Sequence, residues 1–113
     1  SIELPVSKVL YLSYIPCLRL VLIVGACSKQ QNRVTLILAH KNLSKIIQCS
    51  TLSNEFVSRG LGFRADSETH SVSFWNATKG TAEVFKLPNI RKSVFRLQNV
   101  DGMAAVSFYP EKK

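Results

Sequence analysis

His40 and His70 are the only histidines of this chain, and by residue type they are the side chains best suited to transfer protons at neutral pH. Nucleophilic catalysis would need one of them within hydrogen-bond reach of a hydroxyl or a thiol. His70 follows Asp66, Glu68 and several serines, but no Gly-x-Ser-x-Gly motif is present to hold a serine nucleophile in a strained turn. We therefore interpret His70 as a solvated turn residue and predict that the protein is not an enzyme.

The acidic, cysteine and glycine residues also lack the spacing of a chemical site. Acid–base catalysis needs two carboxylates close together, and nothing in the spacing pairs any two of Asp66, Glu68, Glu83, Asp101 and Glu111. The three cysteines match no zinc pattern and are interpreted as reduced thiols: Cys17, Cys27 and Cys49. Gly60-Leu-Gly62 does not form the fingerprint of a phosphate-binding loop, and we interpret it as a bulge or a strand kink. We predict no metal and no cofactor.

Basic and aromatic residues suggest a different kind of chemistry. Lys and Arg outnumber Asp and Glu by 15 to 7, which gives a formal charge of +8. Such an excess is typical of surfaces that bind nucleic acid, and it also serves solubility. Aromatic side chains interleaved with cations could stack the bases of a single strand over a basic groove. The residues that would form this surface are Trp75, Phe85 and Phe95 with Lys86, Arg91, Lys92 and Arg96.

Short β-branched and aromatic runs dominate the elements that would position these residues. Strands are predicted at residues 18–25, 34–39, 72–75, 84–87, 94–97 and 104–109. The polar connection Ser28–Arg33 predicts a hairpin between the first two, and their apolar residues on both faces predict burial on both sides. Only Leu43–Ile47 has a weak helical pattern, so we expect an all-β protein of antiparallel sheets with little helix.

The apolar segment Val9–Cys27 nearly reaches the length of a membrane span. Pro16 and Arg19 lie at its centre, and an arginine at the middle of a bilayer costs about 2.5 kcal/mol or more. A strand, a turn and a second strand accommodate both residues. No membrane span is expected, and with Ser1 at the start we predict a fragment of a longer intracellular protein, of the cytoplasm or nucleus.

Three segments share an apolar strand, an aromatic residue and a turn, which indicates an internal repeat. They are Leu10–Pro16, Arg59–Ala65 and Ala104–Pro110, and their aromatic residues Tyr14, Phe63 and Phe108 lie 49 and 45 residues apart. A second match relates 34–41 to 72–79 at an offset of 38 residues, and at the same offset 45–47 lines up with 83–85. These intervals are close to the length of one propeller blade.

The strand that ends in Phe74-Trp75-Asn76, followed by Gly80 and Glu83–Leu87, resembles repeats of the WD40 β-propeller family. Asn76 stands where that family usually has Asp, and no Gly-His dipeptide is present. The resemblance implies four-stranded blades, with repeat units at 5–56 and 57–102 and the start of a third at 103–113. A small β-barrel or sandwich is the alternative architecture.

The two architectures imply two alternative functions. The propeller resemblance implies a non-enzymatic scaffold that holds protein partners, or the rest of a larger chain, within a multi-subunit complex. A small basic β-barrel would instead bind single-stranded nucleic acid, through Trp75, Lys86, Arg91, Lys92 and Arg96.

Overall fold

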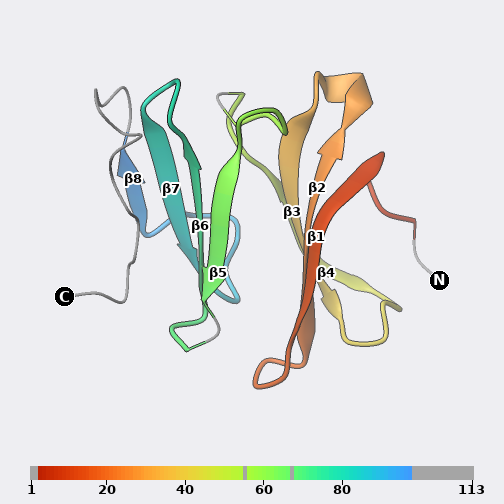
Figure 1. The fold of residues 1–113 in the computed structure, drawn as a ribbon. Helices are drawn as coiled ribbons and strands as arrows, with labels where there is room; N and C mark the ends of the chain where they lie inside the picture. The colour runs from red at the N-terminus through yellow and green to blue at the C-terminus, as the bar shows by residue number, and fades with distance from the viewer. Residues whose placement is uncertain (1–2, 55, 67, 98–113) are drawn as a thin grey trace. The chain divides into compact units, whose positions relative to one another are not determined.

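A computed structural model of the chain describes residues 3–54, 56–66 and 68–97, and these residues form an all-β protein (Figure 1). The predicted fold class of antiparallel sheets with little helix is confirmed. The elements are β1 (Lys8–Ile15), β2 (Leu20–Cys27), a 3-10 helix η1 (Ser28–Gln30), β3 (Arg33–His40), β4 (Ile46–Thr51), β5 (Gly62–Asp66), β6 (Ser71–Asn76), β7 (Thr81–Lys86) and β8 (Phe95–Leu97).

The chain divides into two compact units, Ser1–Arg59 and Gly60–Lys113. Each unit contains one four-stranded antiparallel sheet whose strands follow one another in chain order. The first sheet has the order β1-β2-β3-β4 and the second the order β5-β6-β7-β8 (Figure 1). A predicted strand at 104–109, the end of the predicted unit 57–102 and the start of a third unit at 103–113 lie outside the described residues.

The β2–β3 hairpin forms the centre of the first sheet. Its register runs without interruption from the pair Leu20–His40 to the pair Cys27–Arg33. The predicted polar connection reverses the chain through η1 and through Gln31 and Asn32, which both adopt left-handed backbone conformations. The hairpin predicted from the sequence is therefore confirmed.

Both faces of this hairpin are buried, as its two-sided apolar pattern predicts. Residues 21–26 of β2 and 34–39 of β3 are all buried. On one face, Val21, Ile23 and Ile37 form a cluster. The partly buried residues that pack against this cluster come from the same unit: Leu4, Val6, Leu43 and Ile46. Burial of each large aliphatic side chain contributes about 1.5–3 kcal/mol, so this hairpin is a major source of stability.

The segment before β1 lies against Gly25 of β2. The Ser7 backbone N–H donates to the Ala26 carbonyl at 2.9 Å, and the Ser28 N–H donates to the Ser7 hydroxyl at 2.8 Å. A Cβ atom on Gly25 would lie 2.8 Å from both Val6 methyl groups and 2.9 Å from the Lys8 carbonyl oxygen. Glycine is therefore required here by the close approach of a neighbouring backbone.

A bulge at Leu10 shifts the alternation of side chains between the two faces of β1. Val9 lies opposite Gly25, but the next paired residue, Tyr11, lies opposite Val24. Leu10 is therefore the extra residue of the bulge. Because of this insertion, Val9 lies on the same face of the sheet as Leu12 and Tyr14, which oppose Ile23 and Val21.

An aromatic ladder crosses the second sheet. Phe63, Phe74 and Phe85 occupy neighbouring positions on β5, β6 and β7 and share one face. The Phe74 ring centroid lies 6.1 Å from that of Phe63 and 6.2 Å from that of Phe85, the latter pair in edge-to-face orientation. Such cross-strand aromatic pairs stabilise a sheet beyond the area that they bury.

The turn between β6 and β7 depends on Asn76. The buried Asn76 side chain accepts hydrogen bonds from the Thr78 and Lys79 N–H groups, at 3.1 and 3.3 Å. Gly80 ends the turn with a φ of 67°. An asparagine side-chain oxygen can cap such a turn as an aspartate does.

Two details of the sequence prediction need correction. The weak helical pattern at 43–47 is not realised, because Leu43 has a left-handed conformation and β4 begins at Ile46. The 49-residue repeat interval relates β1 to β5, the first strands of their sheets, but the 38-residue offset relates β3, a third strand, to β6, a second strand. That second match therefore reflects a shared apolar composition and not equivalent positions.

The predicted strand–turn–strand interpretation of the apolar segment 9–27 is confirmed, since this segment lies within β1, the turn at 16–19 and β2. Across the described ranges, no helix is long and apolar enough to cross a membrane.

Candidate functional site

The register of the second sheet determines which of the predicted binding residues lie together. Trp75 of β6 opposes Gly62 and Ala82, and Lys86 of β7 opposes Ser71. Because side chains alternate along a strand, these positions share one face of the sheet. The tryptophan face, as we name it, carries the aromatic side chains of Trp75 and Phe95, the cations Arg64 and Lys86, and the carboxylate of Asp66.

Two other aromatic or basic residues of the predicted cluster lie on the opposite face. Phe85 pairs with Val72, is buried and belongs to the aromatic ladder. Arg96 opposes Glu83, which also faces away from Trp75. Phe85 and Arg96 are each adjacent in sequence to a residue of the tryptophan face, and neighbouring residues of a strand point to opposite sides. The full predicted set therefore does not form one surface.

Arg91 and Lys92 lie in the connection between β7 and β8. Both side chains are exposed, whereas Ile90 beside them is fully buried and anchors the connection. The Asn89 side chain accepts a hydrogen bond from the Arg91 N–H at 2.9 Å, and the peptide bond between Leu87 and Pro88 is cis. The fold thus directs two predicted cations into solvent at one end of the sheet.

The half-buried Trp75 side chain lies against the backbone of β5. A Cβ atom on Gly62 would lie 2.8 Å from the indole Cζ2 and nearer still to Nε1 and Cε2. Gly62, predicted from the sequence to lie in a bulge or strand kink, is instead a regular strand position whose missing side chain makes room for the indole.

The two histidines lie at strand ends on different units. His40 is the exposed last residue of β3, and His70 precedes β6 in a turn, with a φ of 54°. The neighbouring Asp66 carboxylate accepts hydrogen bonds from the Glu68 and Thr69 N–H groups, at 2.9 and 3.3 Å. Asp66 therefore stabilises the turn locally, a role that sequence spacing alone did not reveal.

Metal-binding clusters are absent from the part of the chain that the structure describes: no three His, Cys, Asp or Glu side chains converge there. None of the three cysteines forms a disulfide. Cys17 and Cys49 are exposed and Cys27 is half-buried.

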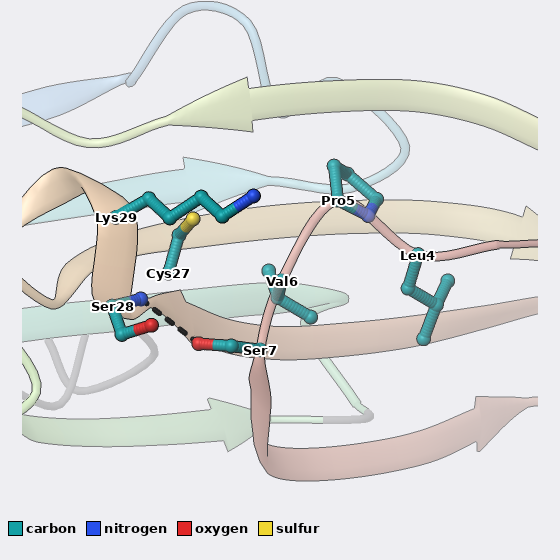
Figure 2. Close-up of a pocket in the computed structure, with 7 residues that line it drawn as sticks. All are labelled: Leu4, Pro5, Val6, Ser7, Cys27, Ser28 and Lys29. Carbon is teal, nitrogen blue, oxygen red and sulfur yellow. Dashed lines mark hydrogen bonds between the residues drawn. The ribbon is translucent and has the colours of Figure 1, made fainter.

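A pocket of about 310 Å³ lies beside the N-terminal segment (Figure 2). Its lining combines apolar and polar residues: Leu4, Pro5, Val6, Ser7, Cys27, Ser28 and Lys29. Figure 2 shows the Ser7 hydroxyl joined to the Ser28 backbone across the pocket. The lining contains no carboxylate or imidazole that could exchange a proton with the thiol or the amine, so the pocket carries no acid–base pair.

Cys49 on β4 opposes Ile37, and desolvation by its apolar surroundings raises the pKa of the Cys49 thiol, although the side chain as a whole is exposed. A raised pKa lowers the thiolate fraction at pH 8, and thiolate is the reactive form. We expect iodoacetamide to alkylate Cys49 more slowly in the folded chain than in urea, because a smaller fraction of the folded thiol is ionised. Mass spectrometry of the labelled peptides measures this, with the exposed Cys17 as the internal reference. Equal relative rates in both states would contradict it.

Together these features define an all-β protein with two consecutive antiparallel four-stranded sheets and an aromatic, basic face on the second. Comparison with protein-family models, with curated proteins and with solved structures found no match to this chain.

Sequence reasoning missed Arg64 as a member of the tryptophan face. Its position depends on the pairing of β5 with β6, which places Arg64 opposite Ser73. The alternation along Gly62–Asp66 carries this information only once that register is known.

Proposed function

We propose that this chain is a non-enzymatic protein-interaction scaffold that contributes β-propeller-type blades to a larger assembly. The observation that supports this proposal is the position of the exposed large apolar side chains. Among the described residues they lie on strands at the edges of the two sheets or directly beside one: Val9, Leu12, Tyr14, Ile47, Val94 and Phe95.

Apolar edge strands favour association with further strands. An edge strand has unpaired N–H and C=O groups, and proteins usually protect such edges with charge, proline or short length. Here β1 is eight residues long and exposes three large apolar side chains. A closed propeller needs four to eight blades, so in this proposal other chains, or other parts of a longer one, supply the remaining strands. Three cysteines without a disulfide fit a reducing compartment such as the cytoplasm or nucleus.

The tryptophan face supports a second candidate, the binding of single-stranded nucleic acid. Trp75 and Phe95 could stack bases, while Arg64 and Lys86 on the same face could contact phosphates. This candidate uses a part of the predicted cluster, with Arg64 added, and leaves the edges of the first sheet unexplained.

Sedimentation velocity of the chain, with and without a fluorescent single-stranded oligonucleotide, distinguishes the two candidates at low and physiological salt. The scaffold proposal predicts self-association of the isolated chain through its apolar edges at β4 and β8, and no nucleic-acid binding at either salt concentration. A stable monomer whose oligonucleotide binding weakens with salt would overturn it in favour of the second candidate.

If the chain is a monomer that binds the oligonucleotide, Trp75→Ala should weaken this binding by about 1–3 kcal/mol. Lys86→Ala should reduce the slope of the logarithm of the binding constant against the logarithm of the salt concentration by about 0.7. Lys79→Ala is the matched control, because Lys79 is exposed in the β6–β7 turn and lies outside the tryptophan face.

A further inference from the structure

β1 has a free edge. It pairs with β2 on one side, and it is the first strand in the order of its sheet. Alternate residues of an edge strand direct their N–H and C=O groups away from the sheet, where an extended peptide can pair with them. The eight residues of β1 are enough for several such hydrogen bonds.

One face of β1 offers an apolar strip to such a peptide. Val9, Leu12 and Tyr14 share this face because of the bulge at Leu10, and their side chains are 46%, 52% and 46% exposed. The strip runs alongside the buried cluster of Val21, Ile23 and Ile37. A strand added to this edge would therefore extend an existing apolar layer.

The charge of the first unit indicates what the added strand carries. Residues 1–59 contain seven Lys and Arg residues but only two Glu residues, and β1–β4 contain no acidic residue. An exposed cation lies at each end of the β1 edge: Lys8 begins the strand, and Arg19 lies in the turn that follows it. A second copy of this chain would bring like charges together at this edge, which disfavours self-pairing.

We propose that the β1 edge binds an extended peptide strand of a partner protein, with apolar side chains at alternate positions and acidic residues at its ends. This proposal rests on the scaffold function and names the kind of partner that one edge accepts. Main-chain pairing supplies affinity, the strip of Val9, Leu12 and Tyr14 selects apolar side chains, and Lys8 and Arg19 select the acidic ends.

The test uses the full chain and a fluorescein-labelled peptide, Glu-Asp-Val-Thr-Ile-Thr-Val-Asp-Glu, followed by fluorescence anisotropy. We expect this peptide to bind at least about tenfold more tightly than the same peptide with Lys at its four acidic positions. N-methylation of alternate peptide nitrogens on the pairing edge should abolish binding. Equal affinity of the acidic and basic peptides, or binding of the N-methylated one, would overturn the proposal.

Leu12→Thr and Ile47→Thr form the matched pair of variants. Both replace an exposed apolar residue with a residue that favours strands, but Leu12 lies on β1 and Ile47 on β4, the opposite edge of the same sheet. Leu12→Thr should lower the affinity for the acidic peptide about tenfold, and Ile47→Thr should leave this affinity unchanged. Hydrogen exchange should show new protection of β1 amides in the complex. Weakening by Ile47→Thr alone would place the peptide at β4, and self-association that Leu12→Thr abolishes would place a second copy of the chain at the β1 edge. Either result would overturn the proposal.

These results are independent of the sedimentation experiment. If the chain self-associates without nucleic acid but does not bind the acidic peptide, the docking proposal fails and the scaffold function stands. If the chain is a monomer that binds oligonucleotide, the scaffold function fails whatever the peptide does.

Discussion

Replacing Phe74 with alanine should lower the free energy of unfolding by about 3–5 kcal/mol. Phe74 is fully buried and lies at the centre of the ladder, where its ring contacts those of both Phe63 and Phe85. The change removes a large side chain and leaves a cavity between two strands. Domains of this size have a total stability of about 5–15 kcal/mol, so the loss is a large part of it. Urea unfolding followed by circular dichroism measures the change.

Phe95→Ala is the matched control for this result. Phe95 is also an aromatic residue of the second sheet, but 45% of its surface is exposed. We expect this change to lower the free energy of unfolding by less than about 1 kcal/mol. Similar losses for the two variants would show that the ladder does not form the core of this sheet.

Gly62→Ala should destabilise the second sheet by about 1–3 kcal/mol, because the new methyl group would occupy the space of the Trp75 indole. Either the indole must rotate away or β5 must separate from β6. Urea unfolding followed by circular dichroism again gives the free energy, and this probe does not depend on the single tryptophan.

A double-mutant cycle tests the cause of that loss. In a Trp75→Ala background, Gly62→Ala should leave the free energy of unfolding almost unchanged, because the indole ring with which the new methyl group collides is absent. An undiminished cost in this background would assign the effect to the backbone of β5 and not to the indole.

The strands of the two hairpins at the centres of the sheets could be predicted from the sequence in outline, because β-branched or aromatic residues occur three times in each of the segments 20–27, 33–40, 71–76 and 81–86. β4 is harder to recognise. Ile46 and Ile47 are followed by polar residues, and the shift of register between Leu38 and Ala39 makes Ile47 an extra residue that breaks the alternation. Its pairing with β3, and not its own composition, determines that this segment is a strand.

The candidate binding surface was predicted only in part, because closeness in sequence does not indicate a shared face. Phe85 and Lys86 are neighbours in the chain and point to opposite sides of β7. The two-residue period separates such neighbours from sequence alone, but the addition of Arg64 to Trp75 and Lys86 depends on a register between strands. That register is set by cross-strand packing, above all by the aromatic ladder and by the space that Gly62 leaves for the indole.

The bulge in β1 also determines where the first sheet tolerates a change in chain length. Deletion of Leu10 would leave Val9 opposite Gly25 and Tyr11 opposite Val24, so every side chain would keep its partner and its face. Deletion of a residue within β2, whose pairing with β3 is continuous, would instead turn half of the strand over and expose its buried side chains. The extra residue thus gives this edge strand a position at which evolution can shorten the chain without rebuilding the core beside it.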